Sequence, residues 1–380
     1  MRTPRPDHFK PTRPTGARRL LCLAAAVGSA AVLAACGGSS VGGQSSAPQS
    51  SALESSGPSA SGQSSTASAS NAASTRPAAR STSGKGGITL RVGDQAGTGA
   101  QALLEASGLL SRLPFKIEWA DFTSGPPMLQ AMGAGSLDVG GVGDAPPVFA
   151  AAGGADIRLV GALSNNPNSA ALLVPHDSKI TSIGELRGKK IAVAQGSSAD
   201  YHLLTVLNKA GLSVRDVTLE YLQPAEALAA LSSGSVDAWD TWSPFVEEAV
   251  AQDHDTILVN GNGYGANYSY VVAARSAIAD ARKAKEIRAY LKVLDQAHAW
   301  ANKHTGAWAA VWARATGLPD RVMQLAANDD TQRPIPVDGT NAASEQSLVD
   351  AFSKAGLIPS RYDFSKYIDP TFNDVLPAGP

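Results

Sequence analysis

Cysteine is almost absent from this 380-residue chain, and the only two, Cys22 and Cys36, lie in its first tenth. A disulfide framework, a cysteine metal site and a cysteine nucleophile are therefore excluded from the body of the protein. An excess of basic residues is also lacking. From Ile88 onward 23 basic residues stand against 31 acidic ones, a net charge of −8. Because nucleic-acid binding needs a basic face, we predict no nucleic-acid partner.

Motifs of catalysis are missing as well. The histidines show no His-Glu-x-x-His spacing, and neither a Gly-x-Ser-x-Gly elbow nor a phosphate-binding loop occurs. His298 and His304 fall in a helical stretch, where a solvated or capping role is the simpler interpretation. We therefore expect a protein that is not an enzyme and that holds neither a cofactor nor a metal.

The first 35 residues have the features of an export signal. Arg18-Arg19 end a basic opening segment and precede an apolar run from Leu20 to Ala35, which is short for a membrane-spanning helix. The segment Leu33-Ala34-Ala35-Cys36-Gly37-Gly38 resembles the bacterial lipobox. This resemblance implies cleavage before Cys36, its lipidation, and anchoring on the extracytoplasmic face of the cell membrane. An ordinary secretory signal and a twin-arginine signal are the alternatives.

Residues 36–87 consist mostly of Ser, Ala, Gly, Gln and Thr. Such a segment cannot bury enough apolar surface to offset the entropy lost on ordering. A coil of this length has a root-mean-square reach of roughly 40 Å. We interpret the segment as a disordered tether that holds a folded domain clear of the membrane.

From Ile88 onward short apolar runs alternate with helical stretches and Gly-rich turns, which is typical of mostly parallel sheets covered by helices. Two extended runs, Ala170–Val174 and Tyr268–Ala273, are expected to cross between two lobes. The pattern predicts an α/β protein with two lobes. Lobe 1 is discontinuous, and the expected ranges are 88–174 and 268–372 for lobe 1 and 175–267 for lobe 2.

Three strand-to-helix junctions place Gly, Ser or Asp just before a helix, where N–H groups and the helix dipole favour an anion. Pro-Pro pairs follow the first two junctions and remove N–H donors, whereas the third keeps its donors and adds two hydroxyls. We expect the third junction to be the tightest anion contact. Ser and Asp also cap helices without any ligand, and capping is the safer interpretation of Asp144. The candidates, in chain order, are Ser124, Gly125, Gly143, Asp144, Gln195, Gly196, Ser197 and Ser198.

Trp239 and Trp242, three residues apart at a strand end, are suited to form a wall for an apolar ligand tail. Either could instead belong to the core. Trp242, in the turn before the next helix, is the better candidate for facing a cleft. The later Trp300, Trp308 and Trp312 have helix-compatible spacing and are interpreted as core packing.

Several pieces of the chain resemble the substrate-binding proteins of ABC importers, in the aliphatic sulfonate-binding family. They run in family order through residues 88–372 and include Arg91-Val92-Gly93-Asp94-Gln95, Phe122-Thr123-Ser124-Gly125-Pro126-Pro127, Gly143-Asp144-Ala145-Pro146-Pro147, Gln195-Gly196-Ser197-Ser198, Asp237-Ala238-Trp239 with Trp242-Ser243-Pro244, and Arg333-Pro334. The resemblance implies a two-lobed type II periplasmic-binding-protein fold that closes over a ligand in the interlobe cleft and delivers it to a membrane permease. We expect a monomer in which Gln95 donates to the ligand, and Arg333 is either a counter-charge or part of a local salt bridge.

The chain departs from the family pattern at several positions. Asp94 and Ala96 flank the first Gln where an aromatic and a basic residue are frequent, Asp240 replaces an apolar residue, and Ser243 replaces an Asp. The added acid favours a ligand with an ammonium or hydroxyl group. The expected ligand is an organosulfonate taken up as a sulfur source, with taurine, nitrate or a pyrimidine precursor as alternatives. A desulfinase or a synthase on the same scaffold would need a Cys nucleophile or a His cluster.

Overall fold

The computed structural model of the protein describes residues 88–95, 99–265, 268–330 and 332–377. All of these lie in one compact unit, Ala79–Pro380. The expected export signal, the tether and Cys36 lie outside the described residues. Within the described ranges, no helix combines the length and the apolar character that a bilayer crossing requires.

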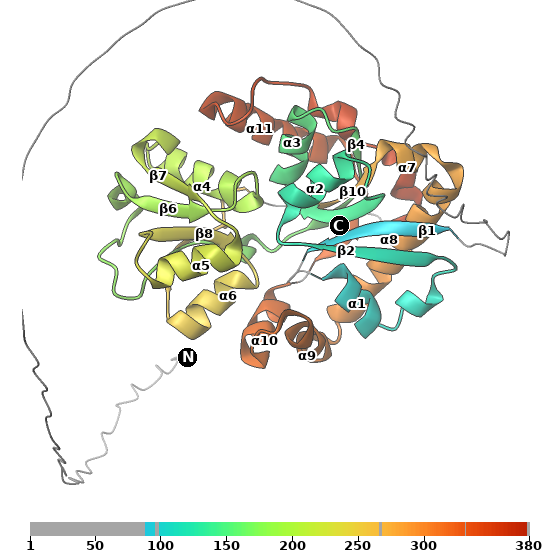
Figure 1. Ribbon diagram of the computed structural model, residues 1–380, viewed down its shortest axis with the longest axis horizontal. Coiled ribbons are helices and arrows are strands. Elements are labelled where there is room, and N and C mark those ends of the chain that lie inside the picture. The colour runs from blue at the N-terminus through green and yellow to red at the C-terminus, as the bar shows by residue number, and fades with distance from the viewer. Residues whose placement is uncertain (1–87, 96–98, 266–267, 331, 378–380) are drawn as a thin grey trace, which may run out of the picture. The chain divides into compact units, whose positions relative to one another are not determined.

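Two separate sheets organise the described chain into two lobes (Figure 1). The first sheet has six strands in the order β11-β4-β10-β3-β1-β2. β1 pairs in parallel with β2 and β3, whereas β10 and β11 run antiparallel to their neighbours. Its strands are β1 (Thr89–Gln95), β2 (Lys116–Phe122), β3 (Val139–Gly143), β4 (Ile157–Ser164), β10 (Tyr268–Ala274) and β11 (Arg333–Ile335).

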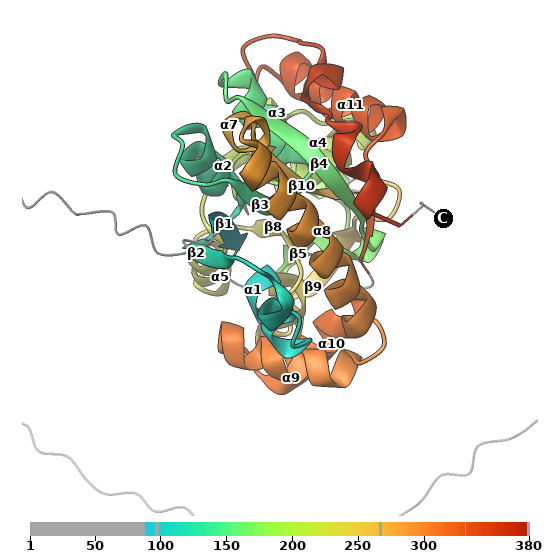
Figure 2. The same cartoon turned by 90° about the vertical axis from the view of Figure 1, so that its right-hand side faces the viewer.

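Helices from both ends of the described chain accompany this sheet. Figure 2 shows the longest of them, α8, running across the sheet, where it contacts β11 and β1. Because α8 and its neighbours follow β10, the C-terminal third of the chain completes the lobe that the N-terminal strands begin. The helices of lobe 1 are α1 (Ala100–Ala106), α2 (Gly125–Gly133), α3 (Ala145–Ala152), α7 (Arg275–Ala279), α8 (Ala281–Ala301), α9 (Thr305–Thr316), α10 (Asp320–Asp329) and α11 (Gly339–Ala355).

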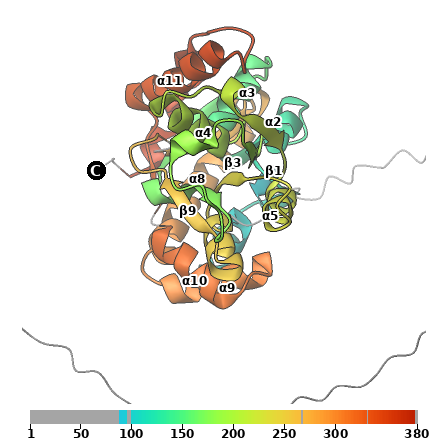
Figure 3. The ribbon, with the colours of Figure 1, turned by 90° about the vertical axis from the view of Figure 1, so that its left-hand side faces the viewer.

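The second sheet has five strands in the order β7-β6-β8-β5-β9. β6 pairs in parallel with β7 and β8, and β5 runs antiparallel to β8 and β9. Figure 3 views the molecule from this lobe, with α4, α5 and β9 labelled on the near side. The elements are β5 (Ala170–Val174), β6 (Lys190–Val193), β7 (Thr218–Tyr221), β8 (Ala238–Trp242), β9 (Thr256–Asn260), α4 (Ser198–Lys209), α5 (Pro224–Ser232) and α6 (Phe245–Glu248), which continues into a π-helical turn, Ala249–Asp253.

The apolar strand β5 shows why this second sheet is buried on both faces. Successive side chains of a strand point to opposite faces. Leu172 and Val174 accordingly pack with Leu203 of α4, whereas Leu173 packs with Leu231 of α5. A continuous apolar run, rather than an alternating one, is typical of a strand covered on both sides.

The two-lobed α/β fold is thus confirmed, but two expectations about it are corrected. Both sheets are mixed, because β5 and β10 run antiparallel to their neighbours. β5 pairs only within the second sheet, so the chain changes lobes between Ser164 and Ala170 rather than after Val174. It returns between β9 and β10.

Candidate functional site

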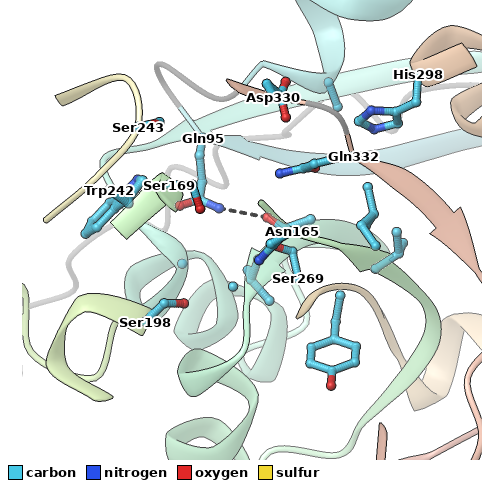
Figure 4. A pocket seen from close by; sticks show the side chains of 18 of the residues that line it. Gln95, Asn165, Ser169, Ser198, Trp242, Ser243, Ser269, His298, Asp330 and Gln332 are labelled. Carbon is cyan, nitrogen blue, oxygen red and sulfur yellow. Dashed lines mark hydrogen bonds between the residues drawn. The ribbon is translucent and has the colours of Figure 1, made fainter. Parts of the chain in front are cut away.

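A cavity of about 170 Å³ lies between the two lobes and is lined by both. Figure 4 shows polar side chains from strand ends and loops of the two lobes converging on it. The residues that line it include Asp94, Gln95, Gly125, Gly143, Asn165, Ser169, Ser197, Ser198, Trp242, Ser243, Ser269, Tyr270, His298, Trp308, Trp312, Asp329, Asp330 and Gln332.

The end of β1 contributes Asp94 and Gln95. The Asp94 carboxylate accepts N–H groups of Gln95, Ala100 and Gln101 at 3.1, 2.9 and 3.1 Å, which fixes the start of α1. Burial raises the pKa of Asp94 to about 6 even though these bonds favour the charged form. The Gln95 amide donates to the Gly141 carbonyl at 2.9 Å, which holds its side chain at the cavity, as expected (Figure 4).

The first junction connects the lobes. Ser124 is fully buried before α2, and its Oγ donates to Oε1 of Gln223 in lobe 2 at 2.9 Å. Thr123 Oγ1 donates to the same oxygen at the same distance. Ser124 therefore bridges the lobes and is not on the cavity wall, whereas Gly125 is. A Cβ at Gly125 would stand 2.7 Å from Cγ of Pro146, so no larger residue fits there without displacement.

The second junction places Gly143 against the opposite lobe. A Cβ on Gly143 would stand 2.0 Å from Oγ of Ser198, the first residue of α4. The neighbouring Asp144 is buried, accepts the Ala145 N–H at 2.8 Å, and is hydrogen-bonded by the Ser198 side chain. Burial raises the pKa of Asp144 to about 6. Asp144 thus caps α3, which is the interpretation that the sequence favoured. It does not line the cavity itself, but its hydrogen bond orients the Ser198 side chain.

At the third junction, more of the hydrogen-bond donors bond within the protein than the sequence suggested. The Gly196 N–H donates to Oδ2 of Asp200 at 2.9 Å. Ser197 caps α4: its Oγ donates to the Ala194 carbonyl at 2.6 Å and accepts the Asp200 N–H at 3.4 Å. Gln195 is exposed and absent from the wall. Ser198 lines the cavity at the helix start, where first-turn N–H groups have no acceptor within the helix.

Trp239 and Trp242 lie in different environments. β8 continues to Trp242 instead of ending at Trp239, and residues three apart on a strand point to opposite faces. Trp239 is 1% exposed and packs in the core beside α5, which corrects the expectation that it covers a ligand tail. Trp242 lines the cavity and packs edge-on against Phe245, with ring centroids 5.8 Å apart.

Arg333 does not reach the cavity. It is exposed on the edge strand β11, opposite Ser164, and its positive charge acts on Asp295 of α8. The expectation of a counter-charge for the ligand is therefore corrected. No group of three or more His, Cys, Asp or Glu side chains suited to a metal ion occurs in the described part of the chain.

Comparisons with known proteins identify relatives of the chain. The family described as NMT1/THI5 like matches residues 123–306. A protein of Escherichia coli (strain K12) named as an aliphatic sulfonates-binding protein is 35% identical over 284 residues, which cover 73% of this chain and 88% of that protein. The alkanesulfonate-binding protein SsuA from Xanthomonas axonopodis pv. citri, solved bound to MOPS, is 33% identical with a TM-score of 0.71 and covers 75% of this chain and 99% of its own. The periplasmic aliphatic sulphonate binding protein SsuA from Escherichia coli is 34% identical with a TM-score of 0.67, covering 74% and 97%.

The chain belongs to the aliphatic sulfonate-binding protein family. These three relatives are binding proteins, which supports a substrate-binding role over the rival hypothesis of an enzyme on the same scaffold. The two-lobed fold expected from the resemblance is also the fold of these relatives.

Some residues of the cavity wall were not predicted from the sequence. Asn165 and Ser169 lie where the chain crosses between lobes, and Asn165 Oδ1 accepts a hydrogen bond from Ser269 at 3.0 Å. The Asn165-Asn166 pair directly follows an apolar strand, and this pattern could have indicated polar wall residues. Trp308 and Trp312 are core residues as expected, stacked with centroids 5.0 Å apart, but they also line the cavity.

The cavity wall of this family member carries no Lys or Arg among the residues that the structure describes. Its one imidazole belongs to His298, whose pKa burial lowers to about 4, so it is neutral near pH 7. An anion here would be held by oriented N–H and O–H groups rather than by a basic side chain.

Proposed function

We propose that the protein captures an aliphatic sulfonate outside the cytoplasm and hands it to an ABC permease, which imports the sulfonate as a source of sulfur. The observation that carries this proposal is the position of Ser198, at the first turn of α4 and on the wall of an interlobe cavity, in a chain of the sulfonate-binding family.

The sulfonate group would bind at the start of α4. Ser198 would turn its hydroxyl from Asp144 to the sulfonate, and the N–H groups of Ser198 and Ala199 at the helix start have no acceptor within the helix. Gly143 lets the opposite lobe approach closely, and Gly125 lines the same cavity. Charge-assisted hydrogen bonds from such donors hold a monoanion strongly without a basic residue. This local arrangement suits a domain whose net charge is −8.

The tail of the sulfonate would lie against aromatic surface. Trp242 from lobe 2 and the stacked Trp308 and Trp312 from lobe 1 line the same cavity. Ligand sites in proteins are mostly apolar with a few placed polar groups, and this wall combines the two. Gln95, held by the Gly141 carbonyl, supplies a further polar contact from lobe 1.

The N-terminal segments would deliver and anchor the receptor. We infer that residues 1–35 are removed on export, that Cys36 becomes lipidated, and that residues 36–87 tether the binding domain to the membrane surface. The domain itself would act as a monomer. Its two lobes, joined by the crossings before β5 and before β10, would close when a ligand contacts both.

Calorimetric titration and thermal unfolding of residues 79–380 with a panel of ligands test this function. The panel contains ethane-, propane- and butanesulfonate, taurine, sulfate, nitrate and a pyrimidine precursor. A sulfonate at about 100 times its Kd should raise the free energy of unfolding by about 2.7 kcal/mol. Binding of nitrate or the pyrimidine compound with no response to any sulfonate would overturn the proposal.

A further inference from the structure

The Ser198 hydroxyl has a single proton to donate, and that proton is already used within the protein. Ser198 hydrogen-bonds the carboxylate of Asp144 in the other lobe, whose Oδ1 also accepts the Ala145 N–H at 2.8 Å. An ionised carboxylate accepts hydrogen bonds and cannot donate them, so Ser198 is the donor of this pair. The two lobes are tightly packed at this contact, because a Cβ on Gly143 would stand 2.0 Å from Ser198 Oγ.

A sulfonate at the start of α4 needs the same proton. Sulfonate oxygens only accept hydrogen bonds, and the group stays ionised across the whole range from acidic to alkaline pH in which proteins fold. When Ser198 turns its hydroxyl to the sulfonate, the Asp144 carboxylate loses a donor and faces the lone pairs of the serine oxygen. A buried, charged acceptor that loses its donor is unfavourable, and Asp144 is only 2% exposed.

The bound anion also adds a second negative charge close to Asp144, and the surroundings do not offset it. Among the residues that the structure describes, no Lys or Arg lines the cavity. His202 of α4 acts on Asp144 and favours its charged form. However, His202 Nδ1 pairs at 2.9 Å with the fully buried Asp240, so this pair together brings little positive charge.

The other titratable groups that act on Asp144 or respond to its charge remain neutral near pH 7. Glu345 of α11 is fully buried, and burial raises its pKa well above the usual value, with a contribution from the charge of Asp144. Burial likewise raises the pKa of Tyr201 in α4 and of Tyr270 in β10. Burial raises the pKa of Asp144 itself only to about 6, so Asp144 is mostly ionised at pH 7 and is the member of this cluster that gains a proton most readily.

We propose that the domain takes up a proton at Asp144 when it binds its sulfonate, so that the Asp144 carboxyl donates to Ser198 Oγ while Ser198 donates to the sulfonate. This inference rests on the proposed function. The proton comes from the solvent and returns to it when the ligand leaves. A neutral carboxyl still accepts hydrogen bonds, so the Ala145 N–H keeps its acceptor and the cap of α3 remains. Asp144 is thus a positioning residue that acts through Ser198 and does not touch the ligand.

Calorimetric titration counts the proton. Butane-1-sulfonate is titrated into residues 79–380 at pH 7 in phosphate, imidazole and Tris, which differ in ionisation enthalpy and carry no sulfonate group. The dependence of the binding enthalpy on buffer should give about 0.5–0.9 protons taken up per sulfonate, because Asp144 is mostly ionised before binding. Binding favours the protonated form, so Kd should be about fivefold higher or more at pH 8 than at pH 6.

The possible results separate the inference from the proposed function. If the sulfonate binds without proton uptake and with the same Kd at pH 6 and pH 8, the inference is wrong and the proposed function stands. If neither butane-1-sulfonate nor its shorter homologues bind at either pH, the proposed function fails, and the inference fails with it.

Asp144→Asn assigns the proton to this residue. The Asn amide donates to Ser198 Oγ as the protonated acid would, without taking a proton from the solvent. The variant should take up fewer than about 0.2 protons, and its Kd should stay within about twofold between pH 6 and pH 8. At pH 8 it should bind butane-1-sulfonate about threefold more tightly than the wild type or better. A purely structural role of Asp144 would not produce this loss of pH dependence.

Asp255→Asn is the matched control. Asp255 is also buried, burial raises its pKa to about 6, and it is not among the residues that line the cavity, so this variant should keep the full proton uptake. If Asp144→Asn does not fold, Ser198→Ala decides: Asp144 then has no donor to lose on binding, and the uptake should fall below about half of the wild-type value. Uptake at the wild-type level in either folded variant would overturn the inference and indicate another acid of the wall, such as Asp94 or Asp330.

Discussion

Gly143 and Ser198 approach each other across the two lobes so closely that a Cβ on Gly143 would stand 2.0 Å from Oγ of Ser198. This contact joins the end of β3 in lobe 1 to the start of α4 in lobe 2. The same serine lines the cavity and is hydrogen-bonded to Asp144. A substitution at either residue should therefore affect both this contact between the lobes and the proposed anion site.

Gly143→Ala should weaken sulfonate binding about tenfold or more, because the added methyl turns the Ser198 hydroxyl away or holds the lobes apart. Thermal stability should change little, since the clash disappears when the lobes open. Gly184→Ala, where a Cβ would meet nothing within 4 Å, is the matched control. Calorimetric titration of both variants checks this, and an affinity of Gly143→Ala within twofold of the wild type would contradict it.

The neighbouring serines of the third junction should differ in their effect on sulfonate affinity. Ser198→Ala removes a hydroxyl from the cavity wall, so we expect about tenfold weaker sulfonate binding, and the lost hydrogen bond to the buried Asp144 should lower the free energy of unfolding by about 1 kcal/mol. Ser197→Ala removes the cap of α4, so we expect a loss of about 1 kcal/mol in the free energy of unfolding, with affinity within threefold. Urea unfolding and calorimetry measure both. The reverse pattern would show that Ser197, not Ser198, binds the anion.

Gln223 should favour the closed arrangement, because its Oε1 accepts hydrogen bonds from both Thr123 and Ser124 of the other lobe. Gln223→Ala removes the shared acceptor and should shift the population toward open lobes, which reduces apparent affinity severalfold. Small-angle scattering of the ligand-free protein should show a larger radius of gyration. Unchanged scattering and unchanged affinity together would mean that this contact does not influence closure.

The stability of the domain should fall as the pH rises from about 4 to about 6. Burial raises the pKa of Asp144 and Asp200 to about 6, above the usual value for Asp, so the native state binds more protons than the unfolded state in this window. Asp138 has the opposite effect, because hydrogen bonds from Arg91 and Lys283 lower its pKa. Its protonation destabilises the folded domain only as the pH falls below about 4.

Thermal unfolding at pH 5 and 7.5 measures this dependence. Asp144→Asn keeps a side chain that can cap α3 and should be more stable than the wild type at pH 7.5 by up to about 2 kcal/mol, with a flatter pH profile. The exposed Asp320→Asn should leave the profile unchanged. A wild-type protein that is more stable at pH 7.5 than at pH 5 would contradict the prediction.

Cys36→Ser should abolish lipidation at this position if the lipobox resemblance reflects processing. In a bacterial host the wild-type chain should appear in the membrane fraction with an acylated N-terminus at Cys36 by mass spectrometry. The variant should retain its signal sequence or leave the membrane. An unmodified, soluble wild-type chain cleaved elsewhere would favour the ordinary secretory signal.

Much of the fold is predictable because its signals are local. The run Ala170–Val174 matches β5 to the residue, since Ser169 and Pro175 bound this apolar segment. β8 extends three residues beyond its expected end because the acid Asp240 resembles a turn residue. Its burial is made possible by His202, 38 positions away, and such long-range compensation leaves no local pattern.

The residues of the cavity wall were predictable at the ends of strands, but not on the helices near the C-terminus. Six of the residues predicted to contact a ligand lie on the cavity wall: Gln95, Gly125, Gly143, Ser197, Ser198 and Trp242. Trp308 and Asp330 reach the wall from helices near the C-terminus, and only tertiary packing brings them there. Helical periodicity marks a buried face but does not distinguish a core from a cavity wall.

The most direct test of the central claim is a crystal structure of residues 79–380 with a bound sulfonate. The account predicts sulfonate oxygens within hydrogen-bonding distance of Ser198 Oγ and of the first-turn N–H groups of α4, with the carbon chain against Trp242. A sulfonate seated away from the start of α4, or bound outside the interlobe cavity, would contradict it.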